Sequence, residues 1–452
     1  MLKPPMKRHQ TFIFEAHELD EKAGEIRLHY SLDDEVEFTE TIVLPATSGQ
    51  WTVDSGKLDA ALFALHLIGG ISYYKTCCPK NIEIRSGTLT KDQAAFWNTV
   101  YENGLGEFFY TNDMNFAGLI AFPASEKRTV EKRVTSKRAN EQRTLIPLGG
   151  GKDSIVTLEM LKKTRADCTL FRMGHHRLIG EIAAVAGLPL LTVERKLSGN
   201  LFRLNEEGAL NGHVPITAYL SCLAVVVAEL YGFDSIAMSN ERSASEGNVE
   251  FHGMRINHQW SKSLTFERAF QKYLEEAIGT NIKCWSQLRP LSELAVAKIF
   301  TTFPQYFAIT TSCNANWRIL RERPRERWCG HCPKCAFVFA LFAAFLSKET
   351  LLGIFEKNLF ERESLLPLGR RLLGIEGFKP FECVGTSEET KAAMLLAHAR
   401  GDFDETPVMK MFLKDAAPST KNPQTVIDEA LRPSSEHAIP EEFLGLIPKS
   451  EF

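Results

Sequence analysis

The stretch Leu145-Ile-Pro-Leu-Gly-Gly-Gly-Lys-Asp-Ser154 predicts a short apolar strand, a triple-glycine turn and the start of an amphipathic helix over residues 154–163. Three consecutive glycines let the backbone turn tightly and approach a ligand without a Cβ in the way. The free N–H groups at the helix start and the positive end of its dipole form a binding site for phosphate or pyrophosphate. The stretch therefore predicts a phosphate-binding turn, with an ordinary glycine turn between strand and helix as the alternative.

Two details narrow the chemistry of this turn. The Walker P-loop needs Gly-x4-Gly-Lys-Ser/Thr, and that spacing is missing between Gly149 and Ser154. Asp153 and Ser154 close the turn, where they can cap the helix or contact phosphate and Mg²⁺. We therefore expect a phosphate site of a different type from the Walker site.

The whole chain has the composition of an ordinary globular protein. Its 452 residues leave room for two or three domains, and 44% of them are hydrophobic. The net charge of −3 gives no overall attraction to nucleic acid or anionic membranes, so any polyanion site must be local. Residues 1–8 lack the apolar core of a signal peptide, and the apolar run 336–346 is too short to span a bilayer. We therefore expect a cytoplasmic protein without nucleic-acid or membrane partners.

Residues 1–125 predict an N-terminal α+β domain. Polar and apolar residues alternate over residues 11–14, 25–30 and 35–44, which indicates antiparallel strands. An apolar helix over residues 58–67 is expected to end at Gly69-Gly70. The adjacent Cys77 and Cys78 are either buried structural thiols or, for one of them, an acid or base acting at carbon.

Residues 126–143 predict a basic linker. This run has seven Lys or Arg against three Glu and almost no apolar residues, so it indicates a solvated helix or a linker at a domain boundary. A phosphate-binding role for its positive charges is a secondary interpretation.

Residues 144–310 predict the central domain, an α/β unit with a doubly wound parallel sheet. After the glycine turn, strands are expected at 168–173, 190–194 and 235–239, helices at 176–186 and 215–230, and a long loop at 198–214. Ligands of such sheets lie beyond the carboxyl ends of the strands. The predicted ligand loops are therefore residues 149–154, 173–176, 212–217 and 240–248.

The last of these loops and the stretch after it are rich in groups that bind anions or exchange protons. Arg242 offers a planar fork to a carboxylate or phosphate, and Lys262 offers a point charge. His258 can exchange protons near neutral pH. Each alone is more often a solvated or core residue, but together they indicate a substrate site.

Four cysteines in the C-terminal part have the spacing of a metal site. Cys313 precedes the run Cys329-Gly-His-Cys332-Pro-Lys-Cys335, and four thiolates from two loops can close a tetrahedral Zn²⁺ site. An iron–sulfur cluster, free or redox-active thiols, and replacement of one ligand by His331 are alternatives. The ten cysteines of the chain fit a reducing compartment better than a disulfide framework.

Around these cysteines we expect a metal knuckle and helical region over residues 311–415, followed by a loose C-terminal tail over 416–452. The arginine-rich residues 318–327 are either a phosphate-binding patch or a solvated segment. Glu382 and Cys383, within an interruption between helices, form another small reactive pair.

Residues Gly149-Gly-Gly-Lys-Asp-Ser154 resemble the Ser-Gly-Gly-x-Asp-Ser signature of the N-type ATP pyrophosphatases, the PP-loop superfamily. These enzymes split ATP into AMP and pyrophosphate while adenylating a substrate. The first position is Gly149 instead of Ser, so one hydroxyl contact to pyrophosphate is lost.

Two families within this superfamily are similar to the chain. The glycine turn, the His213-Val-Pro215 turn and the cysteine run resemble 7-cyano-7-deazaguanine synthase, although the chain is about twice as long. The UDP-N-acetylmuramoyl-L-alanyl-L-glutamate epimerase family is a closer match, through the stretches 71–75, 149–154, 239–248, 257–263, 311–316, 328–337 and 378–385. This resemblance implies ATP-dependent inversion of the terminal L-glutamate of the UDP-linked dipeptide in peptidoglycan precursor synthesis, with release of AMP and pyrophosphate.

The resemblance also implies roles for individual residues. It implies ATP binding by Gly149, Gly150, Gly151, Lys152, Asp153, Ser154 and Met173, with Asp153 as the Mg²⁺ contact. It implies substrate binding by Asn240, Arg242, Asn257 and Lys262, and structural zinc on Cys313, Cys329, Cys332 and Cys335. The acid and base candidates, which the sequence does not rank, are Glu241, His258, Cys77 and Cys78.

Two other functions are alternatives to the epimerase activity. The first is adenylation for amide, nitrile or thio transfer on a heterocycle or tRNA. The second is a non-catalytic nucleotide-binding regulator with a zinc module. Pyrophosphate release that depends on the UDP-dipeptide would separate the epimerase from both.

Overall fold

The computed structural model describes residues 9–45, 54–125, 142–164, 166–317 and 326–448. Within this part of the chain, nine strands form one sheet in the order β11-β8-β5-β6-β7-β3-β2-β1-β4, and two short strands, β9 (Val249–Phe251) and β10 (Met254–Ile256), pair separately. Most of the basic linker and most of the arginine-rich stretch, residues 126–141 and 318–325, lie outside the described residues.

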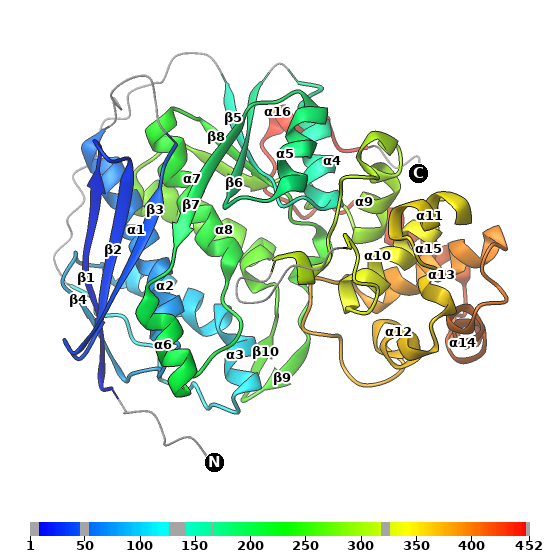
Figure 1. The fold of residues 1–452 in the computed structure, drawn as a ribbon, viewed down its shortest axis with the longest axis horizontal. Coiled ribbons are helices and arrows are strands. Elements are labelled where there is room, and N and C mark those ends of the chain that lie inside the picture. The colour runs from blue at the N-terminus through cyan, green and yellow to red at the C-terminus, as the bar shows by residue number, and fades with distance from the viewer. Residues whose placement is uncertain (1–8, 46–53, 126–141, 165, 318–325, 449–452) are drawn as a thin grey trace.

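One half of the large sheet is parallel and lies at the centre of the molecule (Figure 1). Neighbouring strands run parallel throughout β11 (Lys283–Ser286), β8 (Ser235–Met238), β5 (Arg143–Pro147), β6 (Asp167–Met173) and β7 (Leu190–Lys196). This confirms the α/β fold with a parallel sheet. The strand β11 was not predicted.

The other half of the sheet comes from the N-terminal region. The strands β1 (Thr11–Asp20), β2 (Glu25–Leu32) and β3 (Val36–Val43) are antiparallel, and β4 (Asn81–Ile84) pairs in parallel with β1. β3 also pairs antiparallel with β7, so the predicted N-terminal strands extend the central sheet. At this seam Arg195 of β7 binds both carboxylate oxygens of the buried Glu40 of β3, at 2.8 and 2.9 Å. The division into domains at residue 125 stays a prediction.

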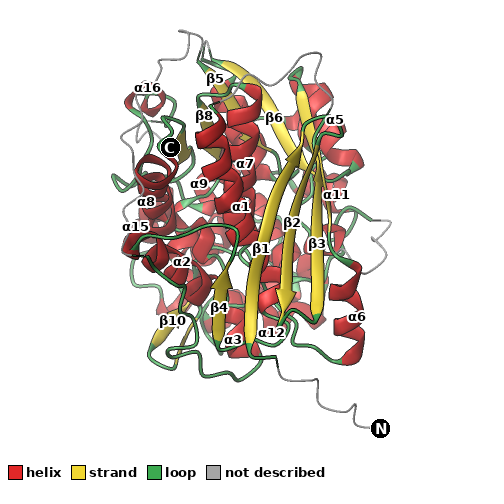
Figure 2. Cartoon of the chain, turned by 90° about the vertical axis from the view of Figure 1, so that its left-hand side faces the viewer, coloured by secondary structure: helices red, strands yellow, loops and turns green. Residues whose placement is uncertain are grey.

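Helices cover both faces of the sheet. They are α1 (Ser55–Tyr74), α2 (Lys91–Gly104), α3 (Gly106–Thr111), α4 (Lys152–Leu161), α5 (Arg177–Ala186), α6 (Gly199–Glu207), α7 (Ile216–Tyr231), α8 (Leu264–Tyr273) and α9 (Glu293–Phe300). Successive residues of a strand point to opposite faces of the sheet, so the strands contribute to two hydrophobic cores. Leu145 and Ile236 pack in one core with α1, α2, α7 and α8. Ile146 and Ala237 pack in the other core with α4, α5 and α9. Figure 2 shows α1 and α7 side by side.

Two local expectations were wrong. α1 does not end at Gly69-Gly70 but continues to Tyr74, because these glycines serve close packing. A Cβ on Gly70 would lie 2.4 Å from the ring of Phe14, and one on Gly69 would lie 2.5 Å from the hydroxyl of Tyr30. The expected loop at 198–214 contains α6, which ends at Gly208 in the left-handed conformation.

The C-terminal region is helical, as predicted, and lies beside the parallel half of the sheet (Figure 1). It contains α10 (Pro333–Ala343), α11 (Lys348–Phe355), α12 (Leu366–Leu372), α13 (Ser387–Arg400), α14 (Pro407–Asp415), α15 (Pro423–Leu431) and α16 (Glu441–Leu444). The C-terminal tail, which the sequence predicted to be loose, packs onto the rest of the molecule over its described residues, because it contains apolar side chains that become buried. Phe443 is 1% exposed and stacks on Trp285 with ring centroids 4.6 Å apart. No helix of the described part has the length and apolar content needed to cross a membrane.

Candidate functional site

The glycine turn lies between β5 and α4, at the carboxyl edge of the parallel strands. Gly150 has φ +79°, and Gly151 precedes α4 without a side-chain cap among the described residues, so the N–H groups of the first turn can bind a ligand. The carbonyl of Gly150 accepts hydrogen bonds from Thr311 N and Thr310 Oγ1 at 3.1 and 3.0 Å. A Cβ on Gly151 would lie 2.7 Å from Ser312 Oγ. Residues 310–312 therefore brace the turn from the side.

Lys152 points away from solvent instead of into the turn. Its side chain is 1% exposed, and its ammonium pairs with the carboxylates of Asp153 and of Glu293 at the start of α9. Lys334 of α10 binds the second oxygen of Glu293 at 3.1 Å. Burial would raise the pKa of Glu293, but the two ammonium groups lower it to about 2. These four residues, Lys152, Asp153, Glu293 and Lys334, form the charge cluster behind the turn, in which Asp153 keeps a 26% exposed side chain.

Glu241 and Glu389 are two further buried carboxyl groups. Glu241 is 4% exposed and accepts a hydrogen bond from Ala244 N at 2.9 Å. Burial, together with the negative charges of Glu293, Glu389 and Asp153, raises the pKa of Glu241 to about 8. Burial also raises the pKa of Glu389. With a pKa of about 8, the carboxyl group of Glu241 carries a proton near neutral pH and can donate it.

Arg289 positions Glu241 and was missed by the sequence analysis. Its guanidinium, 1% exposed, donates to the backbone oxygen of Glu241 at 2.6 Å and pairs with Glu267 at 2.9 Å. Arg289 and Glu293 both follow β11. Because the sequence does not predict that strand, it does not indicate the loop after the strand as a ligand loop either.

A second cluster of ionisable groups surrounds Cys383. Its thiol lies 3.2 Å from Lys262 Nζ and is hydrogen-bonded to His258, whose Nδ1 binds the carboxylate of Glu107. We call Cys383, Lys262, His258 and Glu107 the thiol cluster. Burial would raise the pKa of Cys383, but the Lys262 ammonium and His258 lower it to about 5. The thiol and Glu107 in turn overcome the effect of burial on His258 and raise its pKa to about 9.

The loop that carries Cys383 is held at several points. Asn248 donates to the carbonyl oxygens of Lys379 and Pro380 at 3.2 and 2.9 Å. Asn314, next to the residues that brace the glycine turn, donates to the carboxylate of Glu382. The predicted ligand loop 240–248 and the segment 310–314 therefore both fix the position of Cys383.

Several predicted substrate residues make contacts within the protein. Arg242 donates to the carbonyl oxygens of Glu429 and Arg432, at 3.4 and 3.0 Å. Asn240 binds Ser286 Oγ at 2.9 Å, and Asn257 binds the carbonyl of Ala244 at 2.9 Å. Ser154 Oγ donates to Gly151 O at 3.1 Å, and Met173 ends β6 half-buried. These contacts order the loops around the turn.

Cys77 and Cys78 lie just after α1. Cys78 Sγ lies 3.8 Å from the carbonyl of Lys75, and the ammonium of Lys75 binds Asn211 at 2.7 Å. Burial raises the pKa of Cys77 to about 11 and that of Cys78 further. Both thiols therefore stay protonated near neutral pH, unlike Cys383.

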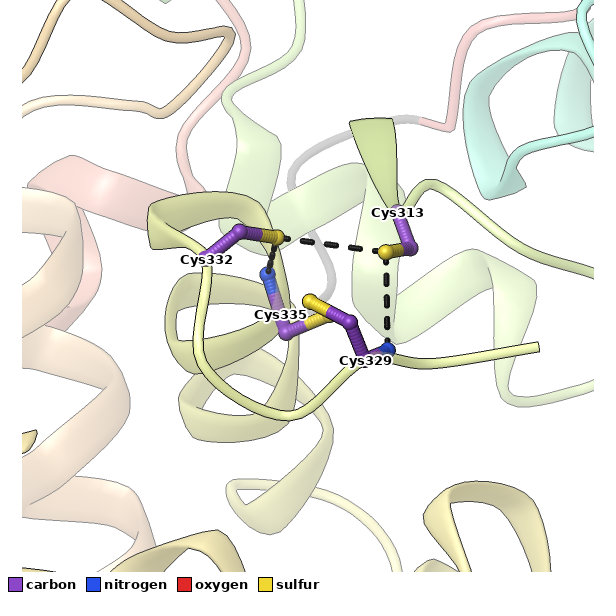
Figure 3. Close-up of side chains that lie close together, drawn as sticks. All are labelled: Cys313, Cys329, Cys332 and Cys335. Atoms are coloured by element: carbon purple, nitrogen blue, oxygen red, sulfur yellow. Dashed lines mark hydrogen bonds between the residues drawn. The ribbon is translucent and has the colours of Figure 1, made fainter. Parts of the chain in front are cut away.

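Cys313, Cys329, Cys332 and Cys335 converge as predicted (Figure 3). Their sulfur atoms all lie within 4.8 Å of one another, with 4.0 Å from Cys313 to Cys332 and 3.7 Å from Cys329 to Cys335. A tetrahedron with metal–sulfur bonds near 2.3 Å needs sulfur separations of about 3.8 Å. The set, which we call the thiol tetrad, therefore fits a tetrahedral metal ion. His331 is not part of it, and its ring binds the carbonyl of Cys329.

Glu107, His213 and His258 also lie close enough to share a metal ion. His258, however, pairs directly with the Glu107 carboxylate and also bonds to Cys383, and its raised pKa keeps it protonated. Burial and the positive charge of His258 lower the pKa of His213 to about 3, so His213 is neutral. The Glu107 carboxylate and the His258 imidazolium therefore form an ion pair beside the neutral His213.

Two family models match the chain: the MurL N-terminal domain over residues 4–287 and the MurL C-terminal domain over residues 309–426. The UDP-N-acetyl-alpha-D-muramoyl-L-alanyl-L-glutamate epimerase of Xanthomonas oryzae pv. oryzae is 39% identical over 436 residues, 96% of each chain. The enzyme of the same name from Micromonospora sp. is 37% identical over 443 residues, 96% of this chain and 97% of its own. The 7-cyano-7-deazaguanine synthase of Sulfolobus acidocaldarius is 24% identical over 239 residues, 46% of this chain and 47% of its own.

Proposed function

This chain belongs to the MurL family of UDP-N-acetyl-alpha-D-muramoyl-L-alanyl-L-glutamate epimerases, and from that membership we propose that it inverts the terminal L-glutamate of the UDP-linked dipeptide to D-glutamate. We propose further that it uses ATP to adenylate the glutamate carboxylate and releases AMP and pyrophosphate in peptidoglycan precursor synthesis. The observation that carries the proposal is an uncapped glycine turn at the start of α4, together with the nearby ionisable groups Glu241 and Cys383, whose pKa values are shifted towards neutral pH.

Adenylation has a clear physical purpose in this reaction. The proton on a carbon next to a carboxylate is very weakly acidic, because the carbanion would sit beside a negative charge. Converting the carboxylate to an acyl adenylate removes that charge and gives a carbonyl that spreads the carbanion as an enolate. A base then removes the proton, an acid returns one to the other face, and water cleaves the adenylate.

The glycine turn is the proposed pyrophosphate site. Gly149, Gly150, Gly151 and Ser154 offer backbone N–H groups at the start of α4, and Met173 at the end of β6 is proposed to contact the nucleotide. Asp153, the most exposed member of the charge cluster, is the proposed Mg²⁺ contact, where the ion would offset phosphate charge. Lys152 would act by fixing Asp153 and Glu293, since its ammonium is bound to both.

The proposed proton-transfer groups are Glu241 and His258. The raised pKa of each leaves it protonated near neutral pH, as a proton donor must be. Burial raises the pKa values of Cys77 and Cys78, so these two thiols are weaker candidates for proton transfer.

For the substrate, Lys262 is the proposed partner of a carboxylate or phosphate, and Asn240, Arg242 and Asn257 are proposed to shape its site. The thiol tetrad is proposed to hold a structural Zn²⁺, which would tie residues 313–316 to α10. Ten free cysteines fit a reducing compartment, so we propose a cytoplasmic location.

One assay tests this function. The pure protein is incubated in D₂O with ATP, Mg²⁺ and the UDP-dipeptide, and pyrophosphate, glutamate chirality and α-deuterium are measured. The expected result is pyrophosphate release that depends on the dipeptide, with D-glutamate carrying deuterium. Pyrophosphate release without deuterium uptake would instead favour transfer chemistry like that of the 7-cyano-7-deazaguanine synthase named above.

A further inference from the structure

The thiol cluster has no complete role in the reaction as proposed so far. Cys383 lies in direct contact with two cationic side chains, Lys262 at 3.2 Å and His258. Cys383 is a partly exposed residue. Partial exposure and adjacent positive charge are typical of cysteines that react as thiolates.

The thiol cluster and the glycine turn border the same segment of chain. Residues Thr310 and Thr311 bind the carbonyl of Gly150, and Asn314, three residues further, binds Glu382 beside the thiol. The ammonium of Lys334 interacts electrostatically with both Asp153 and Cys383. Residues 310–314 and Lys334 thus connect the glycine turn, the site of the proposed carboxylate chemistry, with this thiol.

We propose that Cys383 is the catalytic base that removes the α-proton of the adenylated glutamate, held in place by Lys262 and His258. The proposal rests on the function proposed above. It names a group that is not among the predicted acid–base candidates Glu241, His258, Cys77 and Cys78.

A new Sγ–H bond forms as the Cα–H bond breaks, and the electron pair of that bond moves into the Cα–C bond while the carbonyl oxygen takes the negative charge. A protonated acid, for which Glu241 is the candidate, returns a proton to the opposite face and re-forms Cα–H. The Cys383 thiol then gives its proton to solvent, and the Glu241 carboxylate takes up a proton from solvent. No oxidant or reductant is needed.

Most of the charged groups around the thiol favour its charged form. Lys262 and His258 face it from the chain around η2 (Trp260–Lys262), Lys334 faces it from α10, and Lys379 lies in its own loop. The carboxyl group of Glu382, also in that loop, opposes a thiolate. Burial would raise the pKa of Cys383, yet Lys262 and His258 lower it to about 5. Glu107 keeps His258 charged. We therefore assign Lys262 and Glu107 to positioning and charge, and Cys383 to the bond-breaking step.

The test separates adenylation from proton exchange. Cys383→Ala and Cys383→Ser are compared with the wild type for pyrophosphate formed in a single turnover and for α-deuterium uptake from D₂O. We expect pyrophosphate formation within about threefold of the wild type and a fall in deuterium uptake of about 100-fold or more. The control is Cys168→Ala, which removes a buried thiol at the amino end of β6, whereas the glycine turn lies at the carboxyl ends of the parallel strands.

Each alternative outcome contradicts either the role of Cys383 as the base or the proposed function. Wild-type deuterium uptake by the Cys383 variants would exclude the thiol as the base. Equal loss of pyrophosphate and deuterium uptake in a variant with the wild-type melting temperature would place Cys383 in adenylation instead. Absence of dipeptide-dependent pyrophosphate from the wild type would refute the proposed function itself. Cys168→Ala should keep the wild-type pyrophosphate formation and deuterium uptake, which would show that loss of a thiol elsewhere does not affect the reaction.

Alkylation provides a readout that needs no variant to fold. Wild-type protein is treated with iodoacetamide between pH 4.5 and 9, and the modified peptides are quantified by mass spectrometry. We expect Cys383 to be modified with a midpoint well below that of an ordinary thiol, and one equivalent to stop deuterium uptake. A midpoint near 8.5, the ordinary value, would overturn the proposal.

Discussion

The thiol tetrad and the thiol cluster use the same functional group in opposite ways. Both adjoin residues 310–316: Cys313 belongs to the tetrad, and Asn314 binds the loop of Cys383. In the tetrad four sulfur atoms surround one point and leave a metal ion to supply the positive charge. In the thiol cluster, Lys262 and His258 supply it as side chains. A metal ion fixes its thiolates, whereas neighbouring ammonium and imidazolium groups leave a thiolate free to take up a proton.

The largest expected effect is on the tetrad. Cys335→Ala should abolish stoichiometric metal binding and lower the free energy of unfolding by roughly 5 kcal/mol, because a structural metal contributes directly to folding. Metal content by plasma mass spectrometry and denaturant unfolding would measure this. A variant that keeps one metal per chain and the wild-type midpoint would show that the tetrad is not a structural site. Cys168→Ala is again the control.

The second largest effect on stability is expected for the charge cluster, which links α10 to the glycine turn. Glu293→Gln should cost about 3–5 kcal/mol of unfolding free energy, since it removes the carboxylate that binds the buried ammonium of Lys334 and one of the two carboxylates that bind the buried ammonium of Lys152. The surface change Glu276→Gln, which removes an exposed pair with Lys272, should cost less than about 1 kcal/mol. Equal costs for both would mean that the buried charges are not structural.

A smaller effect should come from removing the cation next to Cys383. Lys262→Met should raise the pKa of the thiol by about 1–2 units, because an adjacent positive charge favours the thiolate. The alkylation midpoint should move to higher pH by the same amount, and deuterium uptake at pH 6 should fall more than at pH 9. Lys272→Met, an exposed change in α8, should leave the midpoint where it is.

The smallest effect, which needs no substitution, is the pH dependence of deuterium uptake. Cys383 must be ionised and Glu241 protonated, so the rate should fall below about pH 5 and above about pH 8. The lowered pKa of Cys383 also stabilises the fold above the pKa of the unfolded thiol, near 8.5, and that contribution is lost as the pH falls through about 5. A rate still rising from pH 8 to 10 would exclude protonated Glu241 as the acid.

Local sequence patterns predicted much of this molecule correctly. The strand, glycine turn and helix around Gly150 are consecutive in sequence, and the tetrad depends on a short cysteine run. These features follow from local rules of turns and ligand spacing. The family resemblance was likewise carried by contiguous stretches, and the family comparisons confirm it.

The missed features are tertiary. Lys262 and Cys383 lie 121 positions apart, and Lys152 and Glu293 lie 141 apart, so no periodicity connects them. The short strand β11 has only four residues and gave no pattern of its own, which hid Arg289 and Glu293. Gly69-Gly70 indicated a helix end because glycine is a poor helix former, but contacts with Phe14 and Tyr30 outweigh that propensity.

The antiparallel pairing of β3 with β7 has a practical consequence for dissecting the protein. A fragment stopping at residue 125 would lose β7, expose the hydrogen-bonding edge of β3 and leave the carboxylate of Glu40 without its arginine. The reciprocal fragment would carry an open edge at β7. Each piece would invite intermolecular strand addition, so two separately expressed halves should precipitate alone and recover solubility when they are produced together.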